Sequence, residues 1–256
     1  MKNIRHIRYR NFYGKEIYFD NKKYFAEEIQ IGGTSARYNS LRLFDSPGAV
    51  TDDYGYDVMP IHIRFALLDK SDNRDNRDLA GSLFASVKPG ILTVYTDDDE
   101  YSIELHLTQT PVFNKVNTHV WRWEADFIAD YPFFQKGRLP NRKTIESYTT
   151  IVYNTSPVPV PVKIRFYTIT PFKNQTSGKG FSVSLPQGAD WIEVDTKNFK
   201  ITDSSGNNAN NCVSFSDEID EVMLLPGKNE IFCPNYSSAG GNNNTLEWWE
   251  LRGAAF

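Results

Sequence analysis

The sequence predicts a mainly β fold, with a barrel-like N-terminal β domain that contains one helix and a C-terminal β-sandwich domain. Short segments in which apolar and polar residues alternate recur along all 256 residues, and such alternation is typical of half-buried strands. The chain also contains 17 Phe and 14 Tyr, residues that pack well on pleated sheets. An aromatic strand near the middle ends at a proline and is followed by polar and basic residues. This indicates a boundary between domains 1–137 and 138–256.

The first half of the chain has the pattern of short strands and one helix. Strands are expected over residues 4–9, 16–19, 24–31, 61–65, 91–96 and 101–108. Leu79, Leu83 and Val87 recur at four-residue spacing and define a helix, which Asp75 or Asp78 can cap and residues 88–90 end. A lone amphipathic helix between strands predicts a plug for the open end or face of a barrel-like sheet. Residues 45–59 are expected to form a projecting loop or arm.

The strand that closes the first domain is the most strongly patterned segment. Its apolar face carries Trp121, Trp123, Ala125, Phe127 and Ala129, while the charged residues mostly lie between them. Pro132 lacks a backbone donor, so the strand is expected to end there.

The second half predicts only strands. Val160, Val162 and Ile164 alternate with prolines and charged residues, and Pro159 and Pro161 predict an edge strand because proline cannot donate to a ladder. Further strands are expected over residues 181–185, 191–195, 199–202, 213–215, 221–225, 230–232 and 246–251. Short strands at this spacing, separated by Gly-, Asn- and Ser-rich turns, favour a sandwich.

Charge and hydropathy exclude several classes of protein. The net charge of −4 gives no basic footprint for nucleic acid, so sequence-specific nucleic-acid binding is not expected. No run of about 18 apolar residues occurs, and no apolar run follows the basic start; membrane contact is therefore not expected. Cys212 and Cys233 are the only cysteines, and free thiols are the simpler interpretation, with a disulfide as the alternative.

No motif predicts a metal, a cofactor or catalysis. Residues 69–80 start like a calcium loop, but Arg74 stands where glycine is needed and Ala80 where a glutamate must close the shell. The four histidines, His6, His62, His106 and His119, have no metal-ligand spacing. No nucleophile, base and orienting group coincide, so the chain is not expected to be an enzyme.

Three tryptophans are the candidate contact residues. Trp191 falls on the strand face opposite Ile192, beside acidic groups, where it could stack on a sugar ring or simply cover the end of the sandwich. The second interpretation is favoured. Trp248 and Trp249 are adjacent, so one is expected to face inward and the other to contact a neighbouring element or subunit, or a glycan.

Three segments resemble distal tail proteins (the Dit family) of long-tailed siphovirus phages, in the short form of that family. They are the Trp-x-x-Asp-Phe-Ile-Ala-Asp-Tyr-Pro-Phe-Phe segment that ends at Phe134, residues 190–201, and residues 223–231. The resemblance implies a structural protein of the virion tail tip, assembled in the bacterial cytoplasm. Residues 1–137 would form a hexameric ring around a DNA channel, with residues 45–59 as a candidate arm, and residues 138–256 a galectin-like sandwich.

The implied partners are the other copies in the hexamer, the tail tube protein, the tape-measure protein, the tail-associated baseplate protein and a receptor-binding or scaffold protein. Ring closure would also give each exposed sheet edge a partner. The alternative function is a carbohydrate-binding module that recognises host cell-wall polysaccharide through the face near Trp191.

Overall fold

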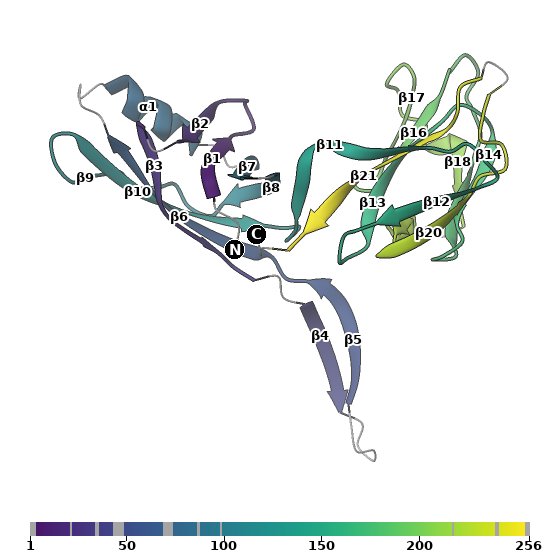
Figure 1. The fold of residues 1–256 in the computed structure, drawn as a ribbon, viewed down its shortest axis with the longest axis horizontal. Coiled ribbons are helices and arrows are strands. Elements are labelled where there is room, and N and C mark those ends of the chain that lie inside the picture. Colours follow the sequence, from purple (N-terminus) through teal and green to yellow (C-terminus); the bar gives the residue numbers. More distant parts are fainter. Residues whose placement is uncertain are drawn as a thin grey trace. The chain divides into compact units, whose positions relative to one another are not determined.

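The computed structural model describes residues 4–20, 22–33, 36–42, 49–68, 74–85, 88–97, 99–216, 218–238 and 241–253. Within them the chain is mostly β, with one α-helix and two short 3₁₀ helices (Figure 1). The prediction of a mainly β fold with one helix is confirmed. Cα packing divides the chain into unit 1, Met1–Gly137 with Arg252–Phe256, and unit 2, Arg138–Leu251.

Unit 1 is built from antiparallel strands in the order β2-β1-β7-β8-β10-β6-β3, with β9 on β10 and the start of β11 on β8. β2 and β3 are the two end strands of this order, and the described residues show no ladder between them. The sheet therefore folds over its core but does not close into a barrel. The elements are β1 (Ile4–Arg10), β2 (Glu16–Phe19), β3 (Tyr24–Ile31), β4 (Ala36–Arg42), β5 (Ala49–Tyr56), β6 (Met59–Leu68), α1 (Arg74–Leu83), β7 (Gly90–Thr96), β8 (Glu100–Leu107), β9 (Asn114–Lys115), β10 (Val120–Ala129) and β11 (Phe134–Thr144).

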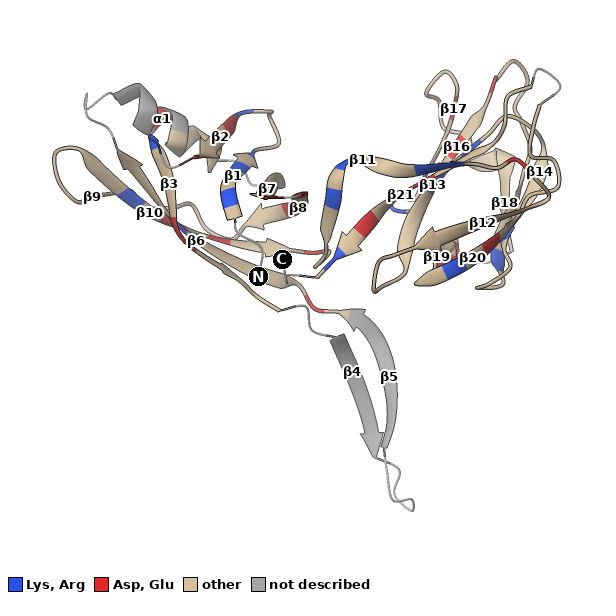
Figure 2. Ribbon diagram, viewed as in Figure 1, with Lys and Arg blue, Asp and Glu red and all other residues tan. Residues whose placement is uncertain are grey.

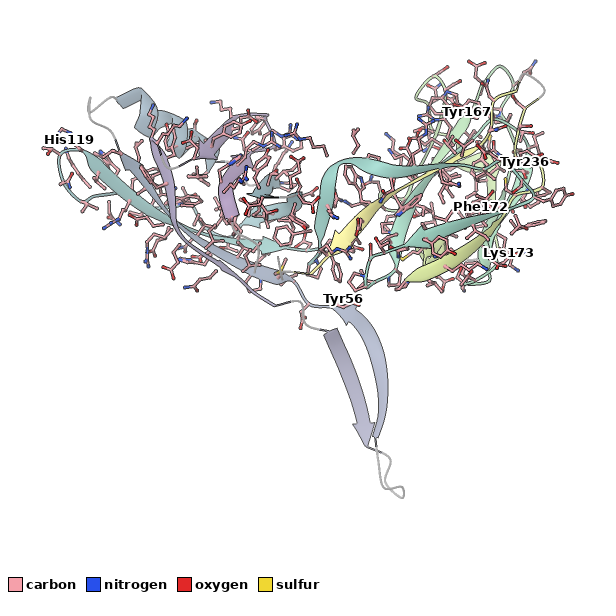
Figure 3. The ribbon with its side chains drawn as sticks, in the orientation of Figure 1. Tyr56, His119, Tyr167, Phe172, Lys173 and Tyr236 are labelled. Atoms are coloured by element: carbon pink, nitrogen blue, oxygen red, sulfur yellow. The ribbon has the colours of Figure 1, made fainter. Side chains whose placement is uncertain are left out.

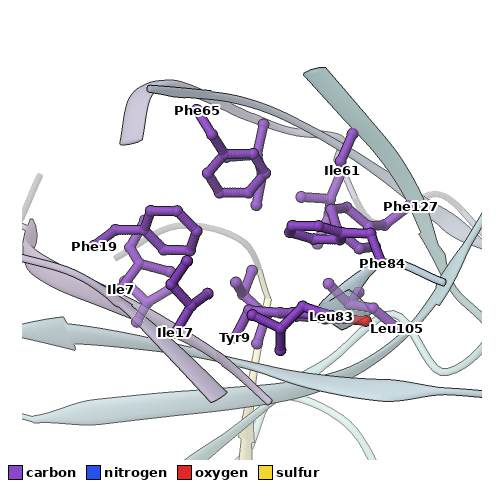
Figure 4. Close-up of a cluster of buried hydrophobic side chains, with 14 of the residues drawn as sticks. Ile7, Tyr9, Ile17, Phe19, Ile61, Phe65, Leu83, Phe84, Leu105 and Phe127 are labelled. Atoms are coloured by element: carbon purple, nitrogen blue, oxygen red, sulfur yellow. The ribbon is translucent and has the colours of Figure 1, made fainter. Parts of the chain in front are cut away.

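The core of unit 1 is rich in aromatic rings. Phe19 from β2 stacks on Phe65 from β6, with ring centroids 4.3 Å apart, and Tyr9 from β1 stacks on Phe84 at 5.2 Å (Figure 4). Phe127 from β10 lies 5.5 Å from Tyr9. Rings from strands far apart in the sequence therefore meet in one cluster.

The patterned central strand is β10, and it packs as its sequence predicts. Trp123, Ala125, Phe127 and Ala129 are buried, and Trp121 is partly buried on the same face. β10 pairs with β6 along its whole length, from Val120 opposite Leu68 to Ala129 opposite Met59. The apolar residues that alternate along the sequence of β10 are therefore the residues whose side chains are buried.

Helix α1 is present but shorter than expected. It begins at Arg74, so Asp75 and Asp78 lie inside it and neither caps it, and it ends at Leu83 rather than near residue 88. Ala80 and Leu83, together with Phe84 just after the helix, are buried in the core of unit 1. Val87 and the side chain of Leu79 lie outside the described residues.

Replacing Gly81 by alanine is expected to stabilise unit 1 by about 0.5–1 kcal/mol. Gly81 lies within α1, where an added Cβ meets nothing within 4 Å, and alanine loses less backbone freedom on folding than glycine does. Urea unfolding should show a higher midpoint. Gly14→Ala is the control: the space there is equally open, but φ is +79°, so this change should lower the midpoint. A lower midpoint for Gly81→Ala contradicts the prediction.

The expected arm contains a β-hairpin. β4 and β5 pair antiparallel, with Ala36 opposite Tyr56 and Arg42 opposite Ala49, and they form a two-stranded sheet of their own. Of the 45–59 segment, residues 45–48 lie outside the described residues, β5 follows, and Met59 begins β6.

Unit 2 contains two sheets that pack face to face. One has the order β17-β16-β13-β21-β11, with β19 beside β13, and the other has the order β12-β20-β14-β15-β18. Phe166 from the first sheet lies 5.8 Å from Phe172 and 5.7 Å from Phe181 of the second. The elements are β12 (Thr149–Asn154), β13 (Val160–Phe166), β14 (Thr170–Asn174), β15 (Lys179–Val183), β16 (Ile192–Asp195), β17 (Lys200–Asp203), η1 (Asn210–Cys212), β18 (Val213–Phe215), η2 (Ile219–Glu221), β19 (Met223–Leu224), β20 (Gly227–Phe232) and β21 (Thr245–Arg252).

The prediction that the strand with two prolines lies at an edge is wrong. β13 is paired on both sides, with β16 through Lys163–Phe166 and with β21 through Val162–Arg165. Pro159 precedes the strand, and Pro161 lies opposite Met223 of the short strand β19. Both prolines therefore come before the stretch that needs donors on both sides.

Candidate interaction surface around Trp191

The outer face of the first sheet of unit 2 carries alternating charges. Because side chains alternate across a strand, Lys163 and Arg165 on β13 point away from the core, as do Glu193 and Asp195 on β16. The register places Lys163 opposite Asp195 and Arg165 opposite Glu193. Unlike charges therefore face each other across the two strands, which stabilises this pairing.

Trp191 lies beside this charge network and is partly buried. The guanidinium of Arg165 lies 4.2 Å from the centre of its indole ring, which is a cation–π contact. Arg165 Nη2 also donates to Glu193 Oε2 at 2.7 Å. One face of the Trp191 ring is therefore covered by a side chain that is itself held in place.

Two cations and two carboxylates form this network. Lys163 Nζ lies 3.3 Å from Glu193 Oε1 and 3.6 Å from Asp195 Oδ2. Burial opposes the charge on Lys163 and on Arg165, yet contacts with the carboxylates outweigh it and raise the pKa of both groups. Lys163 and Arg165 therefore stay protonated at neutral pH.

Trp248 and Trp249 do not join Trp191 in one platform. Trp248 lies opposite Val162 on β13, whereas Trp191 precedes Ile192, which lies opposite Phe166. Five residues of a strand separate these positions, a distance of roughly 17 Å. Trp248 and Trp249 are both partly buried, so neither one is wholly inside or wholly exposed.

The histidines occupy separate places in unit 1. His62 Nδ1 lies 2.7 Å from Asp126 Oδ1, and His106 Nε2 lies 3.2 Å from Asp130 Oδ2. His6 stacks on Tyr95 at 4.2 Å, and His119 is exposed (Figure 3). Among the described residues, no group of three or more His, Cys, Asp or Glu side chains could hold a metal ion. Residues 69–73 of the calcium-like segment lie outside that part.

The cysteines are both free. Cys233 is buried, with its Sγ 3.6 Å from Thr170 Oγ1 and 3.4 Å from Asn244 Nδ2. Burial raises the pKa of the Cys233 thiol, which disfavours the reactive thiolate. Cys212 is partly exposed at the end of η1.

Charged side chains on β3, β6 and β10 form a second charged surface, which the sequence did not predict; Figure 2 marks the charged positions along these strands. Arg64 lies 2.8 Å from both Glu28 and Glu124, one on each neighbouring strand, and Arg122 lies 2.8 Å from Glu27. Such exposed pairs each contribute little to stability. The sequence shows that charged residues alternate along each of these strands, but which charges pair depends on the register between the strands.

A shallow hollow on the outer face of the five-stranded sheet was also not predicted. Its volume is about 290 Å³, and its walls include Lys173, Ser182, Ser214, Ser216 and Phe232. Lys173 and its buried neighbour Phe172 are labelled in Figure 3. Gly180 also lines it, and Ser216 Oγ donates to the Gly180 carbonyl at 2.9 Å.

No family model matches the sequence, and no curated protein does. Solved structures match almost the whole chain. The SPP1 Dit protein, described as a paradigm of the hub adsorption apparatus in Gram-positive infecting phages, shows a TM-score of 0.70 at 11% identity over 96% of this chain and 99% of that one. Chains from the phage P2 baseplate in its activated conformation, with Ca and with Sr, give TM-scores of 0.58 and 0.56, each at 11% identity and over 99% of this chain and 100% of that one.

These matches show that the chain has a Dit-like fold, the fold of proteins from phage hubs and baseplates. No helix in the described part of the chain is long and apolar enough to cross a membrane.

Proposed function

We propose that this protein is a structural hub at the tip of a phage tail, in the manner of the siphovirus distal tail proteins. Six copies form a ring that joins the tail tube to the adhesion apparatus and lets DNA pass. The observation that carries the proposal is the match in fold over nearly the full length of both chains with a phage hub protein. Both units of the chain take part in that match, so it does not rest on a common sandwich alone.

The two units would divide the work. Residues 1–137 form the ring, in which the free strand positions β2 and β3 supply the kind of edges that a head-to-tail contact can pair. The β4–β5 hairpin reaches the next copy as an arm. Residues 138–256 form the galectin-like domain that faces outward. The partners are the tail tube, tape-measure and tail-associated baseplate proteins and a receptor-binding or scaffold protein.

The ring is tested by the mass of the purified protein. Light scattering should give six times the 29.3 kDa mass of the chain, or twelve times where two rings associate, and negative-stain images should show six-fold rings with a central hole. A protein that stays monomeric at every concentration, and also after mixing with its tail tube protein, contradicts the proposal.

The rival function, a carbohydrate-binding module, is tested by Trp191→Ala. Because Arg165 covers one face of the indole, we expect this change to remove a packing contact worth about 1 kcal/mol and to leave glycan-array binding as it was. Ring formation should also be unaffected. Saturable binding to a polysaccharide that Trp191→Ala abolishes and Trp249→Ala does not would favour the module instead.

A further inference from the structure

Strand β12 (Thr149–Asn154) is an open edge of the five-stranded sheet. It pairs in register with β20 through six residues, from Thr149 opposite Phe232 to Asn154 opposite Gly227, with no bulge. β12 is the terminal strand in the order of that sheet. Among the described strands, none pairs with its other side.

The phase of the ladder shows which backbone groups face outward. The Cys233 amide donates to the Tyr148 carbonyl, whereas the Glu230 carbonyl accepts from Gln175 and so points away from β12. In an antiparallel pair, bonded and non-bonded residues alternate. Ile151, opposite Glu230, is therefore at a non-bonded position. It and Tyr153 present their N–H and C=O groups to the open edge.

The side chains of β12 do nothing to protect this edge. The strand reads Thr-Thr-Ile-Val-Tyr-Asn, an uncharged segment without Pro or Gly, which is the type of sequence that pairs with added strands. Ile151 and Tyr153 project on the outer face and are 45% and 62% exposed. Two apolar side chains at alternate positions are what a cross-strand neighbour would cover.

Other edges of the described sheets do carry protective features. β18, at the far end of the same sheet, has only three residues. β17, at the end of the other sheet of unit 2, begins with Lys200 and ends with Asp203. β12, by contrast, has six residues and no charged side chain.

We propose that β12 pairs antiparallel with β12 of a second copy of this chain, joining two five-stranded sheets into one. A second copy fits because β12 has no charged side chain, so two β12 strands side by side do not repel each other. In the register that we assign, Ile151 lies opposite Tyr153 of the copy, and Val152 lies opposite its own counterpart. Each exposed side chain then meets an apolar one, and the free N–H and C=O groups of both residues are paired.

This contact is two-fold and is separate from the ring. A ring is built from head-to-tail contacts, whereas a strand that pairs with itself makes an isologous one. The β12 contact would therefore link two rings, or two single chains if no ring forms. It stands whether or not the proposed hub function holds.

The mass in solution tests the contact with Ile151→Lys, which places a charge on the open edge and leaves the core untouched. The matched control is Ile169→Lys, at a residue 60% exposed that lies outside β12. Wild type and control should have about twice the mass of Ile151→Lys at high concentration. The ratio of two is expected whether the unit is a ring or a chain, so failure of the ring and failure of the contact remain distinct.

Hydrogen exchange tests the same contact without a variant. The amides of Ile151 and Tyr153 should exchange more slowly at high than at low protein concentration, while those of β18, at the opposite end of the same sheet, should not change. Equal exchange at both concentrations overturns the proposal, as does a mass for Ile151→Lys equal to that of wild type. A wild-type protein that stays a single ring or a single chain at high concentration overturns it too. In that case a strand of a different protein would be the partner of β12.

Discussion

Replacing Trp123 by alanine is expected to destabilise unit 1 by about 3–5 kcal/mol, a large share of what a domain of this size has. Trp123 is only 1% exposed. Its ring stacks on Phe113 at 4.8 Å and on Phe65 at 5.4 Å, and lies 6.4 Å from Phe84. Removing the indole leaves a cavity among three other rings that the surrounding strands cannot fill by small movements.

The measurement is urea unfolding followed by circular dichroism, with hydrogen exchange on β6 and β10 to locate the change. Glu124→Ala is the control, because Glu124 is the next residue of β10 but is exposed and makes one surface ion pair with Arg64; its effect should be within about 1 kcal/mol. A Trp123→Ala protein that unfolds at the same urea concentration as wild type would mean that this cluster is not the core of unit 1.

Replacing Gly180 by alanine is expected to destabilise unit 2 by about 3 kcal/mol. A Cβ at Gly180 would lie 2.2 Å from the carbonyl oxygen of Phe172 and 2.9 Å from the Cα of Lys173. Both are backbone atoms of the paired strand β14, so no side-chain rotation relieves the clash. β14 and β15 must move apart, which also disturbs the stacking of Phe172 on Phe181 at 5.2 Å.

Ser182→Ala is the matched control for this position, since Ser182 is on the same strand two residues later and is exposed. It should change the free energy of unfolding by less than about 0.5 kcal/mol. The two variants are compared by urea unfolding and by amide exchange in β14 and β15. If Gly180→Ala matched Ser182→Ala in both measurements, the close approach of these two strands would be refuted.

Much of the fold follows from the sequence because strand burial has a period of two. The alternation of Trp123, Ala125 and Phe127 predicts the buried face of β10 correctly, and the alternation of Val160, Val162 and Ile164 does the same for β13. Each pattern reports only the two faces of its own strand. It contains no information on which strands lie beside it.

The strands that the sequence did not predict lack such a pattern. β11 is largely polar and its side chains are mostly exposed or partly exposed. β4 and β5 pair only with each other in the described sheets. β12 does alternate in burial, but two of its three buried residues, Thr150 and Asn154, are polar. Its sequence therefore shows no alternation of apolar and polar residues. Asn154 is satisfied by donating to the carbonyl of Val158 in the following connection and to the carbonyl of Leu224 in β19.

The sequence by itself determined that the chain is mainly β, where the strongest strands lie, which of their faces are buried, and that one helix accompanies them. These are local properties, set by side-chain polarity and by the geometry of the extended backbone. Only the tertiary structure decided that β13 lies inside one sheet of unit 2, that β12 lies at the edge of the other, and that Arg165 covers Trp191. Edges, registers and stacked pairs depend on hydrogen bonds and contacts between distant segments, which no local pattern contains.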